Sequence, residues 1–130
     1  LAQINAEKFN VENKIQFLKS DWFENVEGIF DMIISNPPYI GWVEQNKIST
    51  EVKKYDPEIA LFAGYDGFDA YKKIIPSLSK FLNQDGLVVL EVGASQSSQV
   101  KDIMNSFGFF DVEILKDLSG KERAVAAKLA

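Results

Sequence analysis

The chain has 130 residues, a net charge of −5 at pH 7 and a hydrophobic content of 46%, as one folded domain or part of one would have. It contains no cysteine or histidine, which excludes disulfides, Cys/His zinc sites and Ser-His or Cys-His catalysis within it. The acidic balance argues against direct nucleic-acid binding. No apolar stretch approaches the ~20 residues that span a bilayer. The absence of cysteine fits a reducing compartment, and we expect the cytoplasm.

The first part of the chain predicts a helix and a short strand. Residues 1–10 favour the end of a helix in which Ile4 and Phe9 make apolar contacts. Ile15–Leu18 has the β-branched and aromatic content of a strand, and the loop Ser20–Glu24 follows it. The pattern therefore places the first strand of the chain at Ile15–Leu18.

The apolar run Phe30–Ser35 predicts a buried strand, which ends in a stiff exit, Asn36-Pro37-Pro38-Tyr39. Each proline fixes φ near about −65° and lacks an N–H group, so the strand cannot continue through Pro37 and Pro38. The exit combines a polar amide, backbone carbonyls without competing N–H donors and an aromatic ring. This cradle suits a planar group with two N–H bonds, such as an amide or an exocyclic amine.

Helices and strands alternate through the rest of the chain. The helix over 67–82 has apolar side chains at spacings of three and four, with Asp66 as a candidate N-cap. The strand over 87–92 is almost entirely apolar and is predicted to be fully buried. In chain order we expect a loop over 40–66 with a short helix near 49–54, the helix over 67–82, a turn over 83–86, the strand over 87–92, a helix over 95–107, and strands over 109–115 and 124–129 joined by a hairpin-like turn.

This order predicts an α/β fold with a mostly parallel sheet. Strands that alternate with helices imply right-handed crossovers and parallel pairing. The last two strands are joined without a helix, which implies one antiparallel member. Ligands of open α/β sheets bind beyond the carboxyl ends of the strands. Asp21 and Trp22, the exit Asn36–Tyr39, and Gly93 all follow predicted strands, so we expect them to meet at one rim of the sheet.

Asn-Pro-Pro-Tyr after a buried strand resembles the motif of class I S-adenosylmethionine methyltransferases that modify planar nitrogens, including adenine-N6 DNA and guanine-N2 ribosomal RNA enzymes. Further segments make the chain similar to the HemK-type (PrmC) glutamine methyltransferases of peptide chain release factors. The resemblance covers nearly the whole chain in the family's order. Besides the exit, it is carried by Ser20–Glu24, Tyr55–Leu61, Gly64–Gly67, Leu90–Gly93 with Gln96, and Lys116–Gly120 before Arg123.

The resemblance implies a Rossmann-like class I methyltransferase three-layer sandwich, of which residues 1–130 would be the C-terminal part of the catalytic domain. The family's sheet order is 3-2-1-4-5-7-6, and this chain would supply strands 3 to 7. The glycine-rich cofactor loop and the acidic residue that holds the ribose are missing. The chain also begins without Met. We therefore expect a piece of a longer polypeptide that is inactive alone and can self-associate through an exposed sheet edge.

The implied reaction moves a methyl group from S-adenosyl-L-methionine to the side-chain amide nitrogen of a glutamine in a release factor. The side chain of Asn36 would accept a hydrogen bond from one N–H group of that amide, and the Pro37 carbonyl would accept one from the other N–H group. Pro38 would stiffen the exit. Tyr39 would lie against the amide plane and near the sulfonium, a favourable cation–π position. Asp21 and Trp22 would contact the adenine of the cofactor, and Asn36 faces cofactor and substrate alike. No strong base is required.

Each of these assignments has a structural alternative. The exit is also an ordinary rigid turn, since Asn-Pro and Pro-Pro are common in loops. Glu91 is either a carboxylate facing the site or a solvated charge at a strand end. Trp42 either covers the site or anchors its loop. Tyr55–Leu61 borders the substrate channel, as the resemblance implies, or forms an ordinary loop. Asp117 and Arg123 are expected to fix the terminal hairpin rather than contact ligand.

Two other functions remain open from the sequence. A nucleic-acid base methyltransferase with the same motif would flip a base into the cradle. Such an enzyme should carry a basic stripe along the rim of the sheet. The candidate residues for this stripe are Lys47, Lys53 and Lys54, and nearby acidic residues offset their charge. The other alternative is a non-catalytic remnant that only binds a partner.

Overall fold

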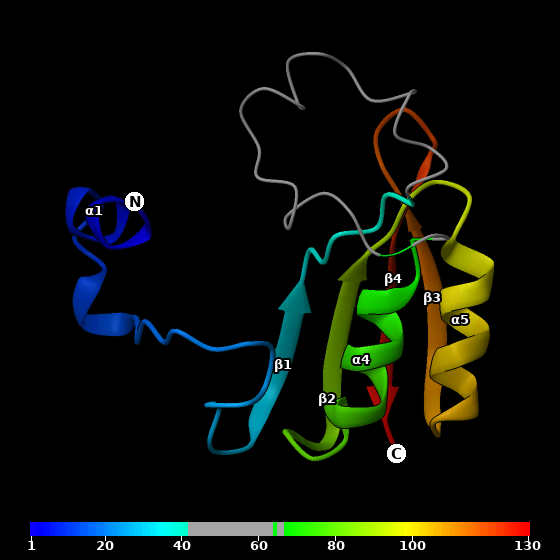
Figure 1. Cartoon of the computed structure of the whole chain (residues 1–130), viewed down its shortest axis with the longest axis horizontal. Coiled ribbons are helices and arrows are strands. Elements are labelled where there is room, and N and C mark those ends of the chain that lie inside the picture. Colours follow the sequence, from blue (N-terminus) through cyan, green and yellow to red (C-terminus); the bar gives the residue numbers. More distant parts are fainter. Residues whose placement is uncertain (42–63, 65–66) are drawn as a thin grey trace.

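A sheet in the order β1-β2-β4-β3 forms the centre of the computed structural model, which describes residues 1–41, 64 and 67–130 (Figure 1). β1 and β2 are parallel, and β4 runs antiparallel to both β2 and β3. The predicted mixed α/β sheet, an incomplete Rossmann-like fold with one antiparallel strand, is confirmed. The strands are β1 (Phe30–Ser35), β2 (Leu82–Glu91), β3 (Phe109–Lys116) and β4 (Glu122–Leu129).

Two amphipathic helices, α4 (Asp69–Leu78) and α5 (Ser97–Ser106), cover one face of this sheet (Figure 1). α4 begins later than predicted because Gly67 has a φ of +82°, which lies outside the helical region. The fully buried core lies between these helices and the strands. Its largest side chains are Tyr71, Ile74, Ile75, Leu78, Val88, Leu90, Val92, Val100, Met104 and Val125.

The turn predicted over 83–86 is wrong, because these residues lie within β2. Phe30 pairs with Leu82 and Met32 pairs with Leu87, so β2 bulges between the two pairs. Asp85 adopts a φ of +61° there. Gly, Asn and Asp favour bulges for the same reason that they favour turns, since they tolerate this backbone conformation.

The N-terminal segment stands apart from the sheet (Figure 1). It contains the helix α1 (Ala2–Lys8) and the 3₁₀ helix η1 (Glu12–Lys14). Ile4 and Phe9, expected to make apolar contacts, are 63% and 69% exposed. The strand predicted at Ile15–Leu18 is wrong, since the segment is irregular here. A strand needs a neighbour for its backbone hydrogen bonds, and no strand of the described residues pairs with this one.

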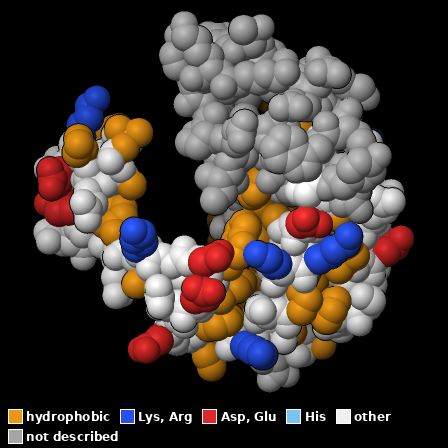
Figure 2. Space-filling view, viewed as in Figure 1, with side chains coloured by type: hydrophobic (Ala, Val, Ile, Leu, Met, Phe, Trp, Pro, Cys, Tyr) orange, Lys and Arg blue, Asp and Glu red, His pale blue; other side chains and the backbone are white. Residues whose placement is uncertain are grey.

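β1 is an edge strand of the sheet, and no helix of the described residues covers its outer face. Met32 and Ile34 point away from the core and are 50% and 69% exposed. Hydrophobic side chains accordingly reach the surface along the edge where β1 lies (Figure 2). An apolar edge with free backbone groups is a site at which sheets pair.

Several predictions concern residues outside the described part of the chain. They are the short helix near 49–54, Asp66 as an N-cap, the loop residues Trp42 and Tyr55–Leu61, and Lys47, Lys53 and Lys54. Within the part that is described, no helix combines the length and the apolar character needed to cross a membrane. The same residues contain no cluster of three or more carboxylates that could hold a metal ion.

Candidate active site

The strand exit after β1 buries one proline and leaves the neighbouring amide exposed. Pro37 is among the fully buried side chains. Asn36 is exposed beside it, and Tyr39 is half-buried. The buried ring anchors a backbone that is already stiff, so Asn36 is presented at the carboxyl end of the strand with little conformational freedom.

Asn36 lines a hollow of about 410 Å³ at the carboxyl ends of β1 and β2. Glu91, the last residue of β2, lines the same hollow. So do Asp117, which follows β3, and Arg123, near the start of β4, on the two sides of the β3–β4 turn. The sheet therefore brings together residues from three separate segments. The complete lining is Ile34, Ser35, Asn36, Val89, Glu91, Asp117, Arg123 and Ala124.

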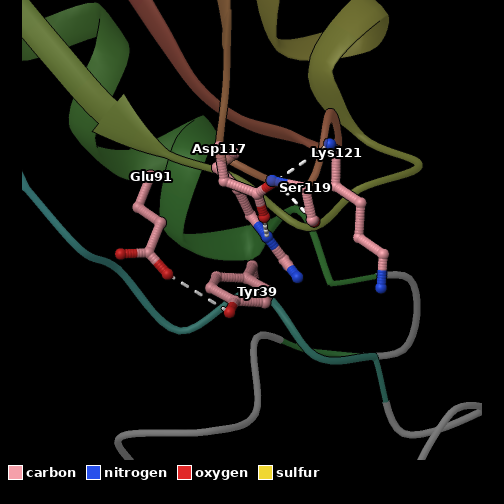
Figure 3. Close-up of polar contacts among 6 residues, drawn as sticks. Tyr39, Glu91, Asp117, Ser119 and Lys121 are labelled. Carbon is pink, nitrogen blue, oxygen red and sulfur yellow. Dashed lines mark hydrogen bonds and ion pairs between the residues drawn. The ribbon is translucent and has the colours of Figure 1, made fainter.

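Glu91 fixes two tyrosines at this end of the sheet. The Tyr39 hydroxyl donates to Glu91 Oε1 at 3.3 Å (Figure 3). The Tyr71 hydroxyl donates to the Glu91 carbonyl at 2.9 Å. Burial, followed by the charge of Glu91 and its hydrogen bond, raises the pKa of Tyr39. Burial also raises the pKa of Tyr71 strongly, and the charges of Tyr39 and Glu91 add to this. Both phenols thus remain neutral hydrogen-bond donors at pH 7, and Tyr39 is not a base.

The hairpin that closes the hollow is organised by one carboxylate (Figure 3). Asp117 Oδ1 accepts hydrogen bonds from the Ser119 hydroxyl at 2.6 Å, the Ser119 amide at 2.8 Å and the Lys121 amide at 3.0 Å. Asp117 Oδ2 accepts from Arg123 Nε at 3.1 Å. These bonds, led by the one from the Ser119 hydroxyl, lower the pKa of Asp117 well below its usual range. These contacts confirm that Asp117 and Arg123 fix the hairpin, while their predicted lack of contact with ligand stays a prediction.

Asp21 and Trp22 lie away from this hollow. They line a separate one of about 280 Å³ beside Lys73 and Ser77 of α4. Phe23 stacks on Phe81, which precedes β2, at a centroid separation of 4.6 Å. The expected meeting of all three segments at one rim is therefore wrong for Asp21 and Trp22. The reason is that the strand which should carry them to the rim does not form.

Gly93 does lie at the expected rim, and the residue that connects it to the strand exit is Gln96. Gln96 is 5% exposed. Its side-chain Nε2 donates to the Tyr39 carbonyl at 2.9 Å, and its Oε1 accepts from the Gly93 amide at 3.1 Å. From the sequence, Gln96 stands out only through the family resemblance, because a contact between residues 57 positions apart leaves no local signal.

A sequence model of the Eco57I restriction-modification methylase family matches residues 2–107. The chain belongs to this family. Similar proteins include a bifunctional methyltransferase of Rickettsia prowazekii, 40% identical over 126 residues, which are 96% of this chain and 24% of that protein. Release factor glutamine methyltransferases are also similar. That of Cereibacter sphaeroides is 37% identical over 99% of this chain and 46% of its own length. That of Clostridium botulinum is 39% identical over 95% and 45%.

The fold of this methylase family member also matches a solved structure. A methyltransferase from Pyrococcus furiosus superposes with a TM-score of 0.62 over 98% of this chain and 55% of that chain, at 19% identity. The predicted methyltransferase fold and the resemblance to release factor glutamine methyltransferases are thus confirmed. The chain spans slightly less than half of those relatives and about a quarter of the bifunctional one.

Proposed function

We propose that this chain is part of an enzyme that transfers a methyl group from S-adenosyl-L-methionine to the side-chain amide nitrogen of a glutamine in a peptide chain release factor. The observation that carries the proposal is the exposed amide of Asn36, held by the buried Pro37 at the mouth of a hollow. Relatives that bear the name release factor glutamine methyltransferase support the substrate. A chain without cysteine suits the cytoplasm.

Residues 1–130 are, in this proposal, the C-terminal part of a class I methyltransferase catalytic domain. The sheet order β1-β2-β4-β3 corresponds to strands 4, 5, 7 and 6 of the order 3-2-1-4-5-7-6. The free edge of β1 is where strand 1 would pair. The share of the relatives that the chain spans supports the same assignment.

The strand exit supplies the acceptors for the substrate. An amide nitrogen is a weak nucleophile because its lone pair is delocalised into the carbonyl group. The Asn36 side-chain oxygen accepts a hydrogen bond from one N–H group of the substrate amide, and the Pro37 carbonyl accepts one from the other N–H group. These two hydrogen bonds concentrate electron density on the nitrogen and favour the transition state. Alignment of this kind can supply ~7–11 kcal/mol. The nitrogen gains a bond to the methyl carbon as the carbon–sulfur bond breaks, and its surplus proton passes to water.

The residues at the hollow fit the positively charged end of the cofactor. When bound, S-adenosyl-L-methionine supplies an electrophilic methyl group on a sulfonium. The Glu91 carboxylate lines the hollow and accepts a hydrogen bond from the Tyr39 hydroxyl, so a negative charge lies at the hollow with an aromatic ring beside it, and both groups attract a cation. Asp21 and Trp22 are proposed to contact the adenine. That assignment is supported by the family resemblance alone, since both residues lie beside α4 in this structure.

The proposal is tested by replacing Asn36 with Ala in the complete protein. We expect kcat for methylation of a release factor to fall by about 100- to 1000-fold, the usual loss for one preorganised hydrogen-bonding group. Cofactor affinity should change little. Asn105→Ala, which truncates an exposed amide on α5, is the matched control. Unchanged turnover in Asn36→Ala would refute the assigned role.

The name of the matching family favours a second candidate, a nucleic-acid base methyltransferase. The net charge of −5 argues against it, because a duplex-binding surface is normally basic. Offering the complete protein a release factor, duplex DNA and ribosomal RNA in parallel separates the two. Mass spectrometry should locate the transferred methyl group on a glutamine amide. A methyl group found only on a nucleic-acid base would replace the first proposal with the second.

A further inference from the structure

Three turns that are distant in the sequence meet on the side chain of Gln96. Its Nε2 donates to the Tyr39 carbonyl at 2.9 Å and is 3.4 Å from the Gly67 carbonyl, which it also contacts as a donor. Its Oε1 accepts from the Gly93 amide at 3.1 Å. The exit of β1, the turn before α4 and the turn after β2 are thus joined by one amide group.

Both glycines at this junction are packed so closely that a β-carbon would force neighbouring atoms to move. A β-carbon on Gly67 would stand 2.4 Å from the Tyr39 carbonyl oxygen and 2.6 Å from Gln96 Nε2. A β-carbon on Gly93 would stand 2.9 Å from Gln96 Oε1 and 3.2 Å from Tyr39 Cδ2. The backbone therefore closes around the Gln96 amide from two sides, which leaves the Tyr39 carbonyl little freedom to move.

The contact with Gln96 fixes one end of the stiff strand exit, at Tyr39, and the sheet fixes its other end, at Ser35. β1 holds Ser35, and Gln96 holds Tyr39, while the two prolines between them restrict the backbone. We propose that Gln96 is a positioning residue that sets the geometry of the acceptors at Asn36 and Pro37. This inference rests on the proposed function and extends it to a residue that does not touch substrate.

The variant Gln96→Glu keeps the shape of the side chain and its acceptor for Gly93. It removes the NH₂ donor and turns a carboxylate toward the carbonyls of Tyr39 and Gly67. Misplacement of a catalytic group by about 1 Å can cost about 100-fold in rate, so we expect that loss in kcat with less than about a twofold change in KM for the cofactor. Gln99→Glu, one turn further on and exposed, is the matched control and should keep the wild-type kcat.

Gly93→Ala tests the same junction from the opposite side. Its methyl group would push on Gln96 Oε1 and on the Tyr39 ring, which are the groups nearest to it. We expect kcat to fall in this variant too, including where Gln96→Glu does not fold. Folding is checked by thermal unfolding, and rates are compared only among molecules that remain folded at the assay temperature.

A measurement that does not depend on activity is hydrogen exchange of side-chain amides in the complete protein. The NH₂ protons of Gln96 should exchange more slowly than those of the exposed Gln99. Equal exchange rates, or wild-type kcat in folded Gln96→Glu or Gly93→Ala, would overturn the inference. If the unmodified protein is active while these variants keep its rate, only the role of Gln96 fails. If the unmodified protein methylates no glutamine, the proposed function itself fails.

Discussion

Residues 1–18 and residues 67–130 have similar apolar content but differ in whether it is buried. In the N-terminal segment Ile4, Phe9 and Leu18 are each more than half exposed. In the C-terminal part Ile74, Leu90 and Val100 are at most 1% exposed. The difference arises because the strands and helices of the second region pair and pack with one another within the described residues. The helices of the first region have no such packing partner among the described residues.

An apolar pattern predicts structure only where the complementary surface is present. Ile15–Leu18 has strand-forming residues as good as those of β1, yet β1 pairs with β2 and Ile15–Leu18 stays irregular. Backbone hydrogen bonds and burial are shared between neighbours, so neither is available to a strand alone.

The largest effect should separate two isoleucines that differ in burial. Ile74→Ala, in the core of α4, should lower the free energy of unfolding by ~2–5 kcal/mol, since it leaves a cavity. Ile4→Ala, on the exposed α1, should change it by no more than about 0.5 kcal/mol. Urea unfolding of the 130-residue chain measures both. Equal losses would show that α1 packs on the core and that its exposed side chains contribute as much to stability as the buried ones.

A smaller effect is expected at the free edge of β1. If this edge substitutes for a missing neighbour by pairing with a second copy, Ile34→Lys should weaken self-association by about tenfold, since charges block edge pairing. Leu118→Lys, at the exposed tip of the hairpin, serves as the control. Sedimentation velocity over a range of protein concentrations gives the association constants. Equal association constants for Ile34→Lys and the unmodified chain would show that the chain self-associates through a surface other than the edge of β1.

The smallest effect concerns the Asp117 carboxylate, which makes its contacts within the hairpin. Its pKa is lowered in the folded chain, so it stabilises the fold at pH values above its ordinary pKa of 3.8. That contribution is lost as the pH falls from there through the lowered value. Asp117→Asn should therefore be less stable than the unmodified chain at pH 7, with the gap narrowing at pH 3. A gap that is the same at both pH values would contradict this account of the hairpin.

Most of the second region could be predicted from the sequence. The strands, α4 and α5 follow from apolar runs and spacings, and the hairpin from its turn residues. The bulge in β2 could not, because Asn83 and Asp85 favour turns and bulges alike, and only pairing with β1 decides between them. The helix α1 was predicted, but the exposure of its apolar side chains was not.

The candidate site shows the same division. The stiff exit at Asn36 and the rim position of Gly93 follow from chain order, since residues after parallel strands meet at one edge. The hydrogen bond from Gln96 to the Tyr39 carbonyl could not be predicted, because it depends on how three turns pack. The adenine contact predicted for Asp21 stays a prediction, since it depends on a strand that lacks its neighbour here.

The most direct test is a crystal structure of the complete protein with a cofactor product and a glutamine peptide bound. We expect the side-chain oxygen of Asn36 to lie about 2.6–3.2 Å from the glutamine side-chain nitrogen, with the Pro37 carbonyl accepting from the other N–H group of that nitrogen. A glutamine amide bound elsewhere, with Asn36 turned toward solvent, would contradict this expectation.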